Sequence, residues 1–133
     1  MGDPLLSKKI LVVEDSFDLL ELLGSGLESL GWEPILAESG RESLAKLECE
    51  TPSLILMDMG LPDMNGFELA AILKRHRVYR RIPILGTTGY PSLIARERCL
   101  AAGCDDFIAK PFAFAALHTR LTRLVPGERP STT

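Results

Sequence analysis

Short apolar runs alternate with segments of helical periodicity along most of the chain. The apolar runs are rich in aliphatic residues and are followed by polar or turn residues, a pattern typical of strands. They lie within residues 9–15 (KILVVED), 33–37 (EPILA), 53–57 (SLILM), 82–87 (IPILGT) and 106–109 (DFIA). Helices are expected over residues 16–30, 39–48, 65–75, 92–102 and 112–125. The predicted order is therefore a strand followed by a helix, repeated five times.

The first predicted helix has the clearest apolar stripe. Its members recur every three or four residues and are Leu19, Leu22, Leu23, Leu27 and Leu30. Gly31 is placed to end this helix, and Ser39 to cap the next one. Leu20 lies off the stripe and Phe17 lies at the start of the helix. Both are therefore expected at the surface, either as scattered apolar residues or as contacts for a partner.

The strands are apolar throughout instead of alternating between apolar and polar residues. Such strands are buried on both faces, which indicates a parallel sheet with helices on each side. The predicted fold is α/β, a doubly wound parallel sheet built from five βα units. Ligands of such sheets bind beyond the carboxyl ends of the strands. The residues that follow each strand are therefore the candidates for function.

Length and composition narrow the class of protein. The chain has 133 residues, enough for one domain, which we expect over residues 9–125 with an extension at 1–8 and a flexible tail or linker at 126–133. A net charge of -3 argues against a surface that binds nucleic acid. No apolar run approaches the roughly 20 residues that span a bilayer. The cysteines, at positions 49, 99 and 104, lack metal-ligand spacing and fit a reducing cytoplasm.

Polar residues follow the strands at one predicted edge of the sheet. They are Glu14 and Asp15 after the first strand, Asp58 after the third, Thr87, Thr88 and Gly89 after the fourth, and Lys110 after the fifth. Carboxylates that share a site repel one another unless a cation compensates them, and Mg²⁺ prefers oxygen ligands. A nearby lysine can hold a phosphoryl oxygen. Taken singly, each residue has an ordinary alternative as a turn, cap or solvated residue, but the combination favours phosphoryl transfer onto a carboxylate.

Four segments carry these residues in order. They are ILVVED, LILMDMGLPDMNGFEL, IPILGTTGY and AGCDDFIAKPF. Together with the spacing from Asp58 to Thr88 and from Thr88 to Lys110, they resemble the receiver domain of two-component response regulators, in the CheY-like superfamily. The resemblance covers about residues 8–125. It implies a flavodoxin-like fold with strand order 2-1-3-4-5.

The resemblance also implies a role for each residue of the site. Asp58 is the expected phosphoacceptor. Mg²⁺, with Mn²⁺ as an alternative ion, is expected on Glu14, Asp15, Asp58 and the backbone carbonyl of Gly60. Lys110 is expected to pair with the phosphoryl oxygens, and its peptide bond to Pro111 to be cis. Thr88 and Phe107 are the expected switch residues.

Some positions depart from the usual family pattern. The acidic pair is Glu-Asp in place of Asp-Asp, which affects only the metal geometry. Gly89 replaces the usual alanine beside the phosphoryl site and leaves that loop freer. Gly60 and Tyr90 occupy positions that tune the attacking water in the family. A glycine at position 60 leaves room for water and a tyrosine at position 90 can cover the site, and the sequence leaves both outcomes open.

The implied function is a phosphorelay step. Asp58 takes a phosphoryl group from the phosphohistidine of a sensor histidine kinase or a histidine phosphotransfer protein. The face formed by residues 92–102, 106–109 and 112–125 then controls a partner or an output domain. The chain catalyses its own phosphorylation and dephosphorylation and is not a conventional turnover enzyme. A cytoplasmic monomer, or a weak dimer formed on phosphorylation, is expected, with Phe17 and Leu20 as candidate kinase contacts.

Rival functions are weaker on the same residues. A degenerate receiver, acting unphosphorylated as an interaction module, is disfavoured by the complete set of site residues. An aspartyl-phosphate hydrolase needs an acid two residues after its nucleophile, where this chain has Gly60. A flavin protein needs a phosphate-binding loop after the first strand, which is missing. Two origins stay open, a stand-alone receiver and a receiver cut from a larger protein such as a hybrid kinase at PGERPSTT. The segment GLPDMNGFELA resembles receivers of hybrid kinases and favours the second.

Overall fold

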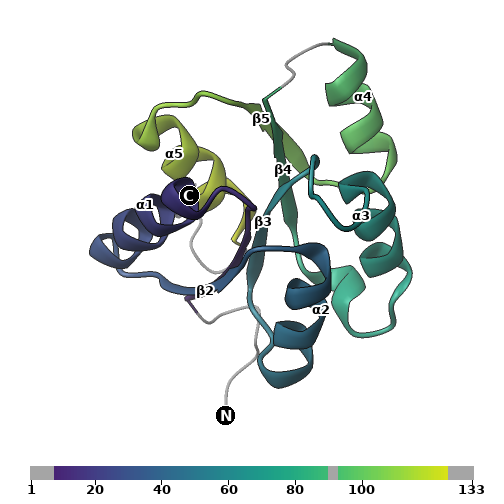
Figure 1. The fold of residues 1–133 in the computed structure, drawn as a ribbon, viewed down its shortest axis with the longest axis horizontal. Helices are drawn as coiled ribbons and strands as arrows, with labels where there is room; N and C mark the ends of the chain where they lie inside the picture. The colour runs from purple at the N-terminus through teal and green to yellow at the C-terminus, as the bar shows by residue number, and fades with distance from the viewer. Residues whose placement is uncertain (1–7, 90–92, 126–133) are drawn as a thin grey trace, which may run out of the picture.

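Five parallel strands form a single sheet in the order β2-β1-β3-β4-β5 (Figure 1). The computed structural model describes residues 8–89 and 93–125. The strands are β1 (Lys9–Val13), β2 (Glu33–Ala37), β3 (Leu54–Asp58), β4 (Ile84–Thr88) and β5 (Asp106–Ala109). The predicted fold class and strand order are confirmed, and each strand lies within two residues of its predicted bounds.

Helices cover both faces of this sheet. They are α1 (Phe17–Ser29), α2 (Gly40–Cys49), α3 (Gly66–Arg75), α4 (Leu93–Ala101) and α5 (Phe114–Leu124). Figure 1 shows α1 and α5 on one side of the sheet and α2, α3 and α4 on the other. A short 3₁₀ helix, η2 (Tyr79–Arg81), was not predicted, because a single turn carries no apolar periodicity. None of the helices in the described part of the chain is long and apolar enough to cross a membrane.

Polar side chains fix where the helices begin. The Ser39 hydroxyl accepts a hydrogen bond from the backbone N–H of Glu42 at 3.0 Å, as predicted for the N-cap of α2. The Asn65 side chain accepts from the N–H of Phe67 at 2.7 Å and caps α3. These caps satisfy amide groups that have no partner inside the helix.

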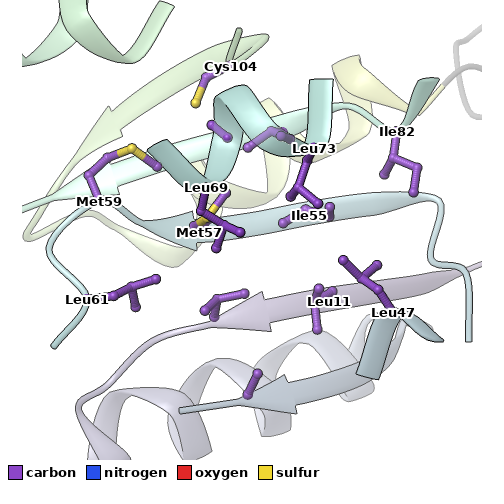
Figure 2. Close-up of a cluster of buried hydrophobic side chains, with 14 of the residues drawn as sticks. Leu11, Leu47, Ile55, Met57, Met59, Leu61, Leu69, Leu73, Ile82 and Cys104 are labelled. Atoms are coloured by element: carbon purple, nitrogen blue, oxygen red, sulfur yellow. The ribbon is translucent and has the colours of Figure 1, made fainter. Parts of the chain in front are cut away.

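Two apolar layers, one on each face of the sheet, form the core. Figure 2 shows the layer beneath α3, in which Leu11, Ile55 and Met57 of the sheet pack with Leu69 and Leu73. The alternate strand residues face the other way and meet α1 and α5; they include Ile10, Val12, Leu54, Leu56 and Leu85. Because successive side chains of a strand point to opposite faces, both sets are buried. This explains why the strands are apolar throughout.

The buried face of α1 differs from the predicted stripe. Leu20, Leu23 and Leu27 are buried, whereas Leu22 is 66% exposed. The prediction of Leu20 as a surface contact for a partner is therefore wrong, because its side chain is only 3% exposed. The chain has leucine at positions 19, 20, 22 and 23, so the sequence fits two helical phases equally well. Packing against the sheet selects the phase that buries Leu20. Phe17 is 58% exposed, as expected.

Candidate functional site

Three carboxylates meet at the carboxyl edge of the central strands. Glu14 and Asp15 follow β1, and Asp58 is the last residue of β3. β1 and β3 are parallel neighbours with Val13 opposite Met57, which brings the next residues, Glu14 and Asp58, side by side. Oxygen atoms of the three acids lie within 4.8 Å of one another. Glu14 and Asp58 are buried, and Asp15 is exposed.

Lys110 supplies the positive charge of this site. It follows β5, and its backbone N–H donates to the carbonyl of Thr88 at 2.9 Å, which fixes its position beside the end of β4. Its Nζ lies 2.8 Å from Oε1 of Glu14 and 3.1 Å from Oδ2 of Asp58. The Lys110–Pro111 peptide bond is cis, as predicted. One ammonium group thus bridges the two buried acids.

Burial and charge act against each other here. Burial raises the pKa of Glu14 above its usual value, even though the hydrogen bond from Lys110 lowers it. Burial also disfavours the charged form of Lys110, but hydrogen bonds to Glu14 and Asp58 and the charges of both acids outweigh this and raise the pKa of Lys110. Lys110 therefore stays charged in this site. Glu14 depends on Lys110 for much of its compensation.

Backbone amides orient two of the carboxylates. The N–H of Gly60 donates to Oδ1 of Asp58 at 2.9 Å, so the two oxygens of Asp58 face different donors. The N–H of Ser16 donates to Oε2 of Glu14 at 3.0 Å. The Gly60 contact is an addition to the sequence prediction, which assigned only the carbonyl of this residue to the metal. That role of the carbonyl stays a prediction.

Gly66 allows the chain to turn closely behind Asp58. Its N–H donates to the carbonyl of Met59 at 3.1 Å. A Cβ atom at this position would lie 2.5 Å from Cα of Met59 and 2.9 Å from the carbonyl oxygen of Asp58. Both contacts are with backbone, which cannot move aside as a flexible side chain does. A residue without a side chain is therefore required here.

The predicted switch residues lie on the two strands beyond Asp58. Thr88 ends β4 and is buried, with Ala109 as its partner on β5. Phe107, opposite Gly86, is only 6% exposed. The ring of this expected switch residue thus already lies inside the protein. Its backbone carbonyl accepts a hydrogen bond from Arg120 of α5. Tyr90 lies outside the described residues.

A hollow beside the site was not predicted. It measures about 290 Å³ and lies next to Gly60 and Thr88; its other lining residues are Met59, Phe67, Ile94, Ala95 and Arg98. The guanidinium of Arg98 lies over the ring of Phe67, 4.2 Å from its centre. Phe67 belongs to α3 and Arg98 to α4, and only the packing of the two helices brings them together. No local sequence signal marks them.

Comparison with known proteins agrees with this geometry. The response regulator receiver domain family matches residues 10–122. The alkaline phosphatase synthesis transcriptional regulatory protein PhoP of Bacillus subtilis is 34% identical over 90% of this chain and 49% of its own length. The polar-differentiation response regulator DivK of Brucella ovis is 33% identical over 81% of this chain and 88% of its own.

Solved structures give the same result. The receiver domain of the sensor histidine kinase PA1611 of Pseudomonas aeruginosa, solved with a magnesium ion in its active site cleft, has a TM-score of 0.81 and 33% identity, covering 90% of this chain and 98% of that one. The chain spans about half the length of the curated transcriptional regulators it matches. The polar residues at the strand ends, the order of the strands and these matches all point to one family. This chain belongs to the response regulator receiver domain family of two-component systems.

Proposed function

We propose that Asp58 accepts a phosphoryl group from the phosphohistidine of a sensor histidine kinase or of a histidine phosphotransfer protein. The observation that carries the proposal is the surroundings of Asp58. Its carboxylate is buried, lies 3.1 Å from the Lys110 ammonium and belongs to a group of three acids whose oxygens lie within 4.8 Å of one another. A nucleophile held among cationic and metal-binding groups is the equipment of phosphoryl transfer.

The acidic group fits a hard divalent cation. It offers only oxygen ligands, and two of its members are buried close together, where their charges repel unless compensated. We assign Mg²⁺ to Glu14, Asp15 and Asp58, with Mn²⁺ as a substitute. The backbone carbonyl of Gly60 completes the protein ligands in this proposal. When bound, the ion neutralises negative charge on the transferred group.

The chemical step uses residues of this chain. An oxygen of Asp58 attacks the phosphorus of the phosphohistidine, the P–N bond breaks and the imidazole leaves with its electron pair. Lys110 stands beside Asp58 and stabilises the charge on the phosphoryl oxygens. The N–H of Gly60 holds the other oxygen of the carboxylate and so orients the nucleophile. Water later hydrolyses the acyl phosphate, which makes this a self-modifying protein and not a conventional turnover enzyme.

The signal passes through residues beyond the site. A phosphoryl group adds up to about two negative charges and three acceptors, and the hydroxyl of Thr88 is the proposed donor to one of them. The proposed output face consists of α4, β5 and α5. Because Phe107 is already buried, we assign the switch to repacking of this face around a fixed ring. Moving such an equilibrium from mostly off to mostly on takes roughly 5.5 kcal/mol of differential stabilisation.

Partner proteins are part of the same proposal. A histidine kinase presents the phosphohistidine, and an output domain or a separate protein reads the α4-β5-α5 face. Exposed Phe17, at the start of α1 beside the acidic group, is the candidate kinase contact that the structure leaves accessible. We propose a monomer, or a weak dimer formed on phosphorylation.

Intact-mass spectrometry after incubation with phosphoramidate tests the proposal. We expect the mass of one phosphoryl group to be gained when Mg²⁺ is present. Asp58→Asn removes the nucleophile and should abolish the gain, while Asp18→Asn, an exposed carboxylate-to-amide control on α1, should keep it. No gain in the unmodified chain, with Mg²⁺ binding also absent, would instead support an unphosphorylated interaction module.

A further inference from the structure

The segment of residues 74–81, KRHRVYRR, is the most basic stretch of the chain. It holds five of the fifteen lysines and arginines and no acid, so the remaining residues carry ten cations against eighteen acids. It spans the end of α3 and the whole of η2. We name it the basic loop. The basic loop precedes β4, whereas Asp58 lies at the carboxyl end of the parallel strand β3. The basic loop therefore lies at the amino ends of the strands, opposite the site around Asp58.

Part of the basic loop serves to hold its shape. Lys74 Nζ donates to the carbonyl of Ile82 at 2.9 Å and pairs with Asp105 at 3.0 Å. The Tyr79 hydroxyl donates to the carbonyl of Leu47 at 3.2 Å, which ties η2 to α2. His76 stacks on Tyr79 with ring centres 4.1 Å apart. These contacts make the basic loop a fixed platform.

The remaining cations of the basic loop project from this platform. Arg75, Arg77, Arg80 and Arg81 are all exposed. Within the described residues, none of the four guanidinium groups forms an ion pair with a carboxylate. Arg75 lies in the last turn of α3, where a cation interacts favourably with the helix dipole. Arg77, Arg80 and Arg81 lie beyond that helix, so the dipole does not account for them.

Apolar side chains accompany the arginines. Val78 is 50% exposed, and Ile72, one turn before Arg75 on α3, is 47% exposed. A nucleic-acid phosphate backbone would use the guanidinium groups but gain little from these side chains, and two half-exposed apolar side chains offer little area for insertion into a lipid layer. A peptide with both acidic and apolar residues would use both, because arginine binds carboxylates through paired hydrogen bonds. We propose that the basic loop docks an acidic segment of a partner protein that also carries apolar residues.

Fluorescence anisotropy with a labelled synthetic peptide tests this docking. The probe is a peptide of glutamate and leucine. The comparison peptide has the same sequence with every glutamate replaced by glutamine. We expect the acidic peptide to bind the full chain in a salt-dependent way. Replacing Arg77, Arg80 and Arg81 together by glutamate should weaken this binding at least about tenfold.

The matched control replaces three exposed arginines elsewhere, Arg41, Arg96 and Arg123, by glutamate, with the same change in net charge. The control should bind nearly as well as the unmodified chain. If circular dichroism shows that the glutamate variant of the basic loop is unfolded, a variant with glutamine at the same three positions is used in its place. The proposal is overturned if the acidic peptide does not bind, or if the two triple glutamate variants lose the same amount of affinity for it. It is also overturned if the glutamine peptide binds as tightly as the acidic one. Tighter binding of duplex DNA or phosphatidylserine vesicles would overturn it too.

Discussion

Lys110 lies nearer to Glu14 than to Asp58, with Nζ–oxygen distances of 2.8 Å and 3.1 Å. The ammonium therefore pairs with a predicted metal ligand as well as with the proposed phosphoacceptor. The Glu14 side chain is 3% exposed, so water compensates little of its charge. Lys110 thus has a structural role besides its proposed chemical one.

We expect Lys110→Met to lower the free energy of unfolding by about 1–3 kcal/mol, the usual effect of leaving a buried polar group unsatisfied. Urea unfolding at neutral pH measures the change. Mg²⁺ should restore part of the lost stability, because it replaces the missing positive charge. The control is Lys46→Met on α2, which should change stability little. A Lys110→Met variant as stable as the original, with or without Mg²⁺, would contradict this role.

Asp63 connects the loop after Asp58 to the start of α2. Its two carboxylate oxygens accept from the backbone N–H groups of Gly40 and Arg41 at 2.9 Å and 2.8 Å. The Arg41 and Gly40 hydrogen bonds lower the pKa of Asp63 below its usual value. The stabilisation is therefore present above the unfolded-state pKa and is lost as the pH falls through the lower folded-state value.

We expect Asp63→Asn to lower the melting temperature at neutral pH. The difference from the original chain should shrink as the pH falls through the acidic range, because both proteins then lack the charged cap. Thermal unfolding followed by circular dichroism over that range measures it. Asp18→Asn, an exposed acid with no such hydrogen bonds in the described residues, is the reference. A difference that does not depend on pH would show that the charge of Asp63 is unimportant.

Gly66→Ala should destabilise the chain by about 1–3 kcal/mol, because the added Cβ meets the backbone of Met59 and Asp58. The displaced loop should also slow phosphorylation of Asp58 by phosphoramidate. Gly89→Ala is the comparison, since a Cβ there meets nothing within 4 Å. The alanine at position 89 should stabilise the chain by about 0.4–1 kcal/mol through the unfolded state. Equal effects of the two substitutions on stability would contradict the clash.

Gly86 in β4 makes room for two thiols. A Cβ at this position would overlap Sγ of Cys99, and Sγ of Cys104 would lie 3.3 Å from it. Gly86→Ala should therefore cost about 1–3 kcal/mol through overpacking. Cys99→Ala opens space at the same point, so the double variant should be more stable than the sum of the single changes predicts. Strict additivity in chemical unfolding would mean that the two positions do not share the space.

The sequence predicted the acidic group because the order of strands and helices alone places strand ends at one edge. Glu14, Asp58 and Lys110 needed no knowledge of packing beyond that. Leu20 was predicted wrongly because adjacent leucines permit two helical phases, and only contact with the sheet selects one. Asp63 caps the start of α2 through hydrogen bonds with Gly40 and Arg41, which lie 23 and 22 positions before it in the chain. No local sequence pattern reveals contacts over such separations.

Lys110 also determines the net charge of the site. Glu14, Asp15 and Asp58 bring three negative charges and Lys110 brings one positive charge, which leaves a formal excess of two negative charges. One divalent ion cancels that excess, whereas a monovalent ion leaves it half balanced and a trivalent ion reverses its sign. On charge balance alone, Lys110 therefore favours a divalent over a monovalent or trivalent ion at the proposed metal site, and its loss would leave the three acids with three uncompensated negative charges.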